Sequence, residues 1–282
     1  MNHRAVWAFI AAGALAASNS AARAQTMSER VKPYLEQTLI AGYGIVSVSA
    51  ASGMPAEAPG SMGSIFGANL AAQVQVASLP YPTSLGGVSL QIVDAVGTSR
   101  LAQLLYVSPG QINYIVPAAI ATGTATINFT DGAGNARSGT VEVLTVAPGL
   151  FTANADGTGV VAATAYRTFV PSTLALPVNV FTCGSAPGSC TAVPIDPGVD
   201  APVTVVLYAT GLKGRSSDSA VTLSIGTQSV PVRLVQSFTD GPLEGIDQVV
   251  FGLPLSLRGA GEVDVILSAG GVASNAGRIH IQ

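Results

Sequence analysis

The chain has 282 residues, of which 48% are hydrophobic and only 10% are charged, against about 25% charged in an average globular domain. Its formal net charge is −3, and no basic patch interleaved with aromatic residues occurs, so nucleic acid is not an expected partner. Short Val, Ile and Thr runs alternate with Gly, Pro, Asn and Asp, and long helical patterns are lacking. The composition therefore indicates an all-β protein.

Residues 1–24 are typical of a signal peptide. A basic start, Met1–Arg4, precedes the apolar run Ala5–Ala17 and the small-x-small pattern Ala22–Ala24. We expect cleavage near Gln25 and an exported product, extracellular, periplasmic or at the cell surface; an uncleaved N-terminal anchor is the alternative. No later run reaches the roughly 18 apolar residues of a transmembrane helix. Cleavage leaves 10 basic against 15 acidic residues, a net charge of −5.

Residues 25–42 contain the best helical pattern of the chain. Val31, Leu35 and Leu39 recur at helical spacing, whereas Pro33 limits how far a helix can extend. We expect a partly helical lead-in that docks on the first domain. A recognition helix is the alternative interpretation.

Residues 43–146 carry about seven strand signals in roughly a hundred residues, the spacing of an immunoglobulin-like β-sandwich. The expected strands are Ile45–Ser49, Ser64–Leu70, Gly87–Ile92, Leu101–Val107, Gln111–Val116, Thr124–Thr130 and Gly139–Val146.

Residues 201–282 repeat this plan and predict a second immunoglobulin-like β-sandwich in tandem. The clearest match is between Gln111–Pro117 and Gln248–Pro254: in both, a Gln precedes a Pro by six residues and apolar side chains fill alternate positions. Alternation places one set of side chains on a single face of a strand, and the closing Pro ends the strand. The order of the other strands agrees as well, which favours an internal duplication.

The connecting residues 147–200 predict a small β subdomain with a disulfide hairpin. Cys183 and Cys190 are the only cysteines, and they flank a Gly/Pro/Ser-rich tip between two strand-like arms. In an exported protein we expect them to pair. Closing so short a loop stabilises by about 2.5 kcal/mol on the chain-entropy model, enough to hold the tip rather than the fold. Their spacing does not match a C-x-x-C redox motif.

Several of these segments together resemble a known family. The strings Ser64–Leu70, Leu85–Val88, Leu105–Asn113, Ala147–Phe151, Leu207–Leu212, Gly245–Pro254 and Gly259–Val265 are similar to the uncharacterised secreted domain of Solibacter-type Acidobacteria. The resemblance covers most of the chain from Ile45 to Gln282. It implies an exported, immunoglobulin-like (IPT/TIG-like) module with no assigned activity and no catalytic residues. Val250 stands where the family commonly has Asn, whereas Asn113 is kept.

Chemically reactive residues are few, and no cofactor is expected. His280 is the only histidine after Gln25, which argues against His-dependent triads and His-based zinc sites. An oxygen-rich calcium site is the one metal hypothesis, and its candidate ligands are Asn154, Asp156, Asp196 and Asp200.

We therefore expect a secreted, non-catalytic protein used for adhesion, as a surface scaffold or for binding an extracellular protein or polysaccharide. The candidate binding surfaces are Tyr106, the face with Gln111 and Asn113, and the disulfide tip, because binding on such folds usually lies on loops or exposed edges. The alternatives are a polysaccharide-active enzyme that uses a pair of carboxylates, or an accessory module of one.

Overall fold

The computed structural model describes residues 44–169, 174–186 and 188–282. The proposed signal peptide and the lead-in 25–42 lie outside the described residues. Within those ranges the protein is all-β: it contains strands and three short 3₁₀ turns, and no helix is long and apolar enough to cross a membrane.

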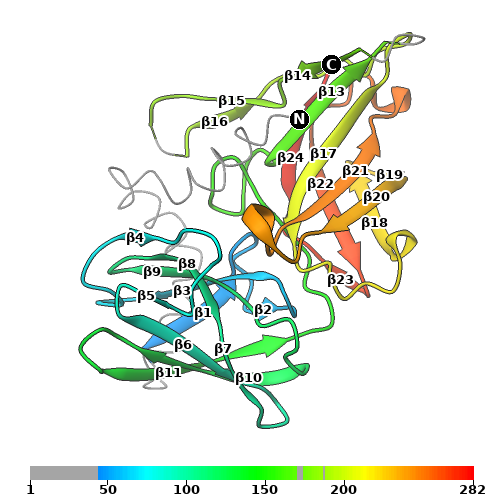
Figure 1. Cartoon of the computed structure of the whole chain (residues 1–282). Helices are drawn as coiled ribbons and strands as arrows, with labels where there is room; N and C mark the ends of the chain where they lie inside the picture. Colours follow the sequence, from blue (N-terminus) through cyan, green and yellow to red (C-terminus); the bar gives the residue numbers. More distant parts are fainter. Residues whose placement is uncertain (1–43, 170–173, 187) are drawn as a thin grey trace.

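Two sheets form the N-terminal pair (Figure 1). The first has the order β1 (Ile45–Ser49), β3 (Met62–Gly67), β9 (Gln111–Ile115), β8 (Gln103–Val107) and β4 (Gln75–Val76). The second has the order β2 (Ala56–Glu57), β11 (Ala136–Val143), β10 (Gly123–Thr130), β6 (Val88–Val93) and β5 (Ser84–Leu85), with β7 (Ser99–Leu101) also paired to β6. Alternate residues of both sheets, among them Ile65, Tyr114 and Phe129, meet in one hydrophobic cluster.

Two further sheets form the C-terminal pair, drawn from green to red in Figure 1. One has the order β14 (Ala175–Val178), β13 (Ala163–Thr168), β17 (Val203–Thr210), β21 (Asp247–Gly252) and β20 (Val232–Ser237), with β12 (Gly149–Leu150) paired to β17. The other has the order β19 (Gln228–Val230), β18 (Val221–Ile225), β22 (Gly261–Ala269) and β23 (Val272–Ala273), with β24 (Gly277–Ile281) paired to β22. A second cluster fills the space between them.

The remaining elements are short. They are the hairpin of β15 (Phe181–Cys183) and β16 (Cys190–Ala192) and the 3₁₀ turns η1 (Asp218–Ala220), η2 (Gly241–Leu243) and η3 (Leu255–Leu257). The residues of β12, β13 and β14 lie in the connecting stretch 147–200, and all three strands belong to the same sheet as β17.

One predicted strand divides between two sheets. The sequence predicts a single strand over Leu101–Val107, but β7 ends at Leu101 and pairs with β6, whereas β8 begins at Gln103 and pairs with β9. Between them the Ala102 N–H donates to the Leu90 carbonyl across 2.9 Å. The chain thus crosses from one sheet to the other at Ala102 while its backbone remains hydrogen-bonded, and the hydrophobic pattern continues through the crossing because both sheets face the same core.

Candidate binding faces of the sheets

Gln111 and Asn113 lie together on the outer face of the first N-terminal sheet. Strand pairing places Asn113 opposite Ser64, and its Oδ1 accepts hydrogen bonds from Ser64 Oγ and from Gln111 Nε2, each across 2.8 Å. Tyr106 stands opposite Asn113 on the other neighbouring strand. The structure therefore brings the three sequence-predicted residues together, but Tyr106 is only 5% exposed and offers little surface to a ligand.

The four candidate calcium ligands have other partners or remain apart. The Asn154 side chain hydrogen-bonds to backbone groups. Its amide NH2 donates to the carbonyls of Gly188 and Cys190, and its Oδ1 accepts from Val160 N–H. Asp156 caps its own turn by accepting from Thr158 N–H. Asp196 pairs with Arg258 across 3.0 Å, and Asp200 is exposed. In the described part of the chain, no group of three or more His, Cys, Asp or Glu side chains is placed to hold a metal ion.

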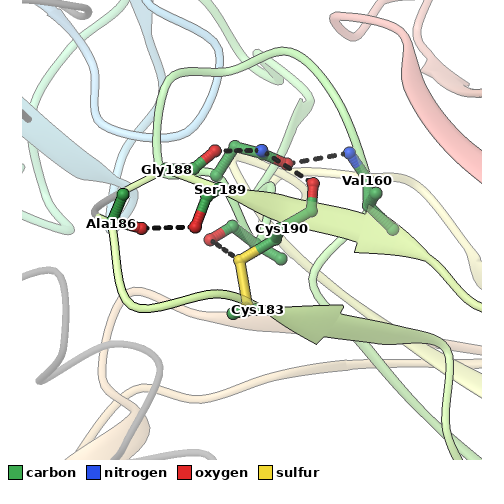
Figure 2. Close-up of a disulfide and its surroundings, with 8 residues drawn as sticks. Val160, Cys183, Ala186, Gly188, Ser189 and Cys190 are labelled. Carbon is green, nitrogen blue, oxygen red and sulfur yellow. Dashed lines mark hydrogen bonds between the residues drawn. A yellow bond between two sulfur atoms is a disulfide. The ribbon is translucent and has the colours of Figure 1, made fainter.

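The disulfide between Cys183 and Cys190 is confirmed (Figure 2). It joins the two antiparallel strands β15 and β16 at their last paired position. Asn154, from a different part of the chain, also reaches the tip: its amide donates hydrogen bonds of 2.5 Å to the Gly188 carbonyl and 3.1 Å to the Cys190 carbonyl. The hairpin is therefore fixed both by its own cross-link and to the loop before β13.

Glu57 is a buried carboxyl group that the sequence analysis missed. Tyr114 donates its hydroxyl hydrogen to Glu57 Oε2 across 2.6 Å, and Ser47 Oγ donates to Oε1 across 2.8 Å. Burial raises the pKa of Glu57 to about 7, although these two hydrogen bonds oppose the rise. Gly63 makes room for the group, because a Cβ there would lie 2.6 Å from the Tyr114 ring. A single Glu in a Pro/Ala/Gly-rich stretch carries no periodic signal.

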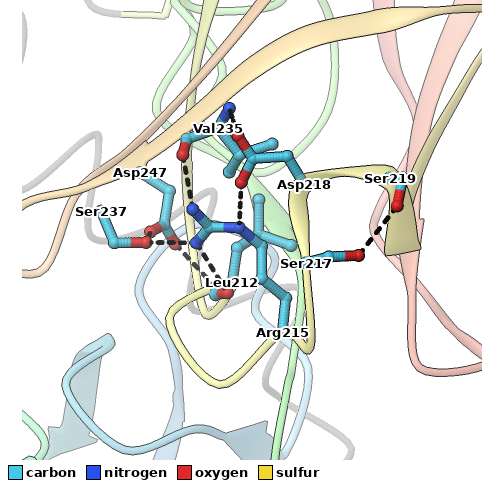
Figure 3. Close-up of polar contacts among 8 residues, drawn as sticks. All are labelled: Leu212, Arg215, Ser217, Asp218, Ser219, Val235, Ser237 and Asp247. Carbon is cyan, nitrogen blue, oxygen red and sulfur yellow. Dashed lines mark hydrogen bonds and ion pairs between the residues drawn. The ribbon is translucent and has the colours of Figure 1, made fainter.

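Asp247 is a second buried carboxyl group, at the start of β21. It accepts hydrogen bonds from Leu212 N–H across 2.7 Å and from the Ser237 hydroxyl, and burial raises its pKa. Arg215 lies beside it and donates to Ser237 Oγ and to the carbonyl of Val235 (Figure 3). This network connects the loop after β17 to the two strands at one edge of the sheet.

Arg215 and Asp218 occupy the free edge of β20. Arg215 Nη2 donates to the Val235 carbonyl across 2.5 Å, and Asp218 Oδ2 accepts from Val235 N–H across 3.1 Å. The two side chains are themselves paired across 2.9 Å. They therefore satisfy the backbone groups that an additional strand would use, as expected where a protein protects an exposed sheet edge.

The outer face of the β14–β13–β17–β21–β20 sheet is another candidate binding face. The strand register places eight side chains on this face, and they are aromatic, hydroxyl, amide or aliphatic. They are Thr164, Tyr166, Thr204, Val206, Gln248, Val250, Leu234 and Gln236. Tyr166 and Thr164 are half-buried, and Gln236 is exposed. Gly252 adds no side chain beside Thr204, and the Arg233 guanidinium lies over it. None of these side chains is a carboxylate.

The two pairs of sheets meet through their outer faces. Met62 and Ile115 from the N-terminal pair pack with Ala162, Tyr208, Leu243 and Ile246 from the C-terminal pair in a third hydrophobic cluster. At its centre Thr210 is fully buried; its Oγ1 accepts from Met62 N–H across 2.9 Å and donates to the Gly245 carbonyl across 2.6 Å. Hydrophobic packing and hydrogen bonds thus join the two pairs.

The described structure thus defines an all-β, β-sandwich-like protein with one disulfide. No family model and no curated protein matches the sequence. A distant structural match is SGBP-B of the Bacteroides ovatus mixed-linkage glucan utilization locus, in complex with a mixed-linkage heptasaccharide. The sequences are 12% identical and the TM-score is 0.32; the match covers 81% of this chain and 43% of the other. The chain therefore spans less than half of that protein, and we infer neither ligand nor activity from the similarity.

Proposed function

We propose that this is an exported, non-catalytic protein of two immunoglobulin-like units that binds an uncharged polysaccharide on the outer face of the β14–β13–β17–β21–β20 sheet. The observation that carries the proposal is the chemistry of that face: one partly exposed aromatic ring, Tyr166, lies among hydroxyl and amide groups without a carboxylate.

These groups suit a sugar chain. The apolar face of a pyranose ring packs on an aromatic ring, whose hydroxyl can hydrogen-bond at its edge. Thr164, Thr204, Gln236 and Gln248 supply further donors and acceptors for sugar hydroxyls. Arg233 borders the face, and the only other described charges that we place at its margin, Arg215 and Asp218, are paired with each other, so the surface lacks the cationic character that nucleic acid requires. An extended sheet face also matches the shape of a linear polymer.

The tandem arrangement is supported by the equivalent strands β9 and β21, which begin the two Gln…Pro segments. Strand β9 lies between β3 and β8, and β21 lies between β17 and β20, in both cases antiparallel to its neighbours. An internal duplication accounts for this agreement. Among the described residues, the outer-face aromatic ring that is partly exposed is Tyr166 in the C-terminal copy, so we assign binding to that copy.

A binding screen tests the proposal. Protein exported from the full gene is purified and applied to arrays of plant and bacterial polysaccharides and of extracellular proteins. We expect binding to at least one uncharged polysaccharide and none to polyanions. Binding to proteins alone would instead support the adhesion or scaffold role, and preferential binding to polyanions would contradict the assignment.

A carboxylate-dependent polysaccharide-active enzyme is the second candidate. Of the three carboxyl groups in the described residues whose pKa values are raised, Glu57 and Asp247 are buried in the protein. The third is Glu244: partial burial and the neighbouring Asp240 raise its pKa. Asp240 and Glu244 are therefore the pair to test, by activity screening of the wild type against Glu244→Gln. Hydrolysis that this substitution abolishes would favour the enzyme.

A further inference from the structure

The outer face of the first N-terminal sheet is buried where the fold leads one to expect exposure. In a two-layer arrangement, side chains that point away from the core alternate with buried ones. Strand β10 of the opposite sheet follows this rule. In β1 all five residues are buried, and in β3 all but the last, Gly67.

The outward-pointing residues of β1, β3 and the nearby strand β8 include several apolar side chains. Val46 and Phe66 stand opposite each other and are 6% and 3% exposed; Val48 is fully buried, and Tyr106 is 5% exposed. None of the four belongs to the three hydrophobic clusters formed by the described residues. The C-terminal pair of sheets contacts this face at Met62 and Ile115. The three clusters therefore do not account for the burial of these four side chains.

The chain itself supplies a suitable segment. Residues 25–42 immediately precede Tyr43 and Gly44, which lead into β1 at the margin of this sheet. Their sequence carries Val31, Leu35 and Leu39 at a spacing of four, which lines up apolar side chains on one side of a helical turn. Four strands at about 4.8 Å spacing make a face ~19 Å wide, whereas eighteen residues reach ~27 Å even if fully helical.

We propose that residues 25–42 dock on the outer face of the β1–β3–β9–β8 sheet, with their apolar stripe over Val46, Phe66 and Tyr106. Gln111 and Asn113, half-buried beside Tyr106, are the polar part of the same surface and hydrogen-bond the docked segment. The triad of Tyr106, Gln111 and Asn113 thus recognises the protein's own N-terminal segment. Removal of the signal peptide leaves this segment as the new N-terminus.

Photo-crosslinking of the full exported chain tests the proposal directly. A benzoylphenylalanine replaces Tyr106, and a second protein carries it in place of Val96, which is 74% exposed, as the control. We expect an intramolecular crosslink from position 106 to a peptide within residues 25–42 and none from position 96. Crosslinks from position 106 to a second copy, crosslinks only to other parts of the chain, or none at all would overturn the proposal.

Substitutions within the segment provide an independent measurement. Leu35→Asp combined with Leu39→Asp removes the apolar stripe, whereas Gln37→Asp combined with Thr38→Asp adds the same charge at polar positions. With cleavage at Gln25 verified by N-terminal sequencing, the apolar pair is expected to raise the fluorescence of an apolar-surface dye several-fold and to lower the Tm. Equal behaviour of the two variants would contradict docking.

Discussion

The Tyr114 hydroxyl donates a 2.6 Å hydrogen bond to Glu57 in the interior of the N-terminal pair of sheets, where both side chains are almost fully buried. A carboxyl group in this position favours its neutral form, because burial disfavours the charge more than two hydrogen bonds favour it. Protonation of one residue is therefore coupled to the stability of the fold.

The sign of this coupling is fixed by the pKa of Glu57, which is raised from 4.5 to about 7 on folding. The folded protein binds the proton more tightly, so the contribution is fully present below pH 4.5 and is lost as pH rises to about 7. The loss is about 3 kcal/mol in unfolding free energy. In Glu57→Gln this part of the pH dependence is expected to disappear in urea unfolding measured between pH 4.5 and 7.5. Glu142→Gln, on neighbouring β11, is the control; a fall as steep in Glu57→Gln as in the control would contradict the account.

Thr210 is expected to hold the two pairs of sheets together. Thr210→Val keeps the shape of the side chain but leaves Met62 N–H and the Gly245 carbonyl without their buried partner. We expect a loss of about 2 kcal/mol in unfolding free energy, measured by chemical denaturation. Thr222→Val, on the exposed side of β18, is expected to change the unfolding free energy by only a few tenths of a kcal/mol. Similar values for both variants would show that the Thr210 contacts do not stabilise the junction.

Arg215 is expected to keep the protein from associating through β20. In Arg215→Ala the Val235 carbonyl loses its donor and Asp218 loses the cation that positions it, so the strand edge is freed for pairing with another chain. Sedimentation velocity should show concentration-dependent self-association. Arg278→Ala removes only exposed ion pairs and is expected to remain like the wild type. A monodisperse Arg215→Ala protein of unchanged sedimentation coefficient would refute this role.

Periodic hydrophobicity predicted the strand content from local pattern alone, and the two cysteines that flank a turn-rich tip predicted the disulfide hairpin. It placed Ile112 and Tyr114 together on one face of a strand, and both belong to the core cluster. It could not detect the crossing at Ala102, because the two sheets share one core and the pattern runs through unchanged. Glu57 was missed for a related reason: its burial depends on Ser47 and Tyr114, which are distant in sequence and supply its hydrogen bonds.

In the candidate site too, local pattern predicts some features, whereas others depend on tertiary packing. Pattern analysis named Tyr106, Gln111 and Asn113, and the pairing of β8 with β9 places them side by side. The pattern could not foresee that Tyr106 is buried, because burial on an outer face depends on what packs there. The Tyr166 face escaped notice because its polar residues come from strands scattered between positions 164 and 252, and only sheet order brings them together.

The most direct test of the account is titration of a polysaccharide identified by the array into wild-type protein, Tyr166→Ala, Tyr166→Phe and Thr222→Ala. Loss of the ring is expected to weaken binding at least tenfold, roughly the 1.4 kcal/mol that aromatic packing supplies. Tyr166→Phe retains the ring and is expected to lose less, and Thr222→Ala, on the opposite sheet, should bind as the wild type does. Wild-type affinity in a correctly folded Tyr166→Ala protein would contradict the assignment of this face.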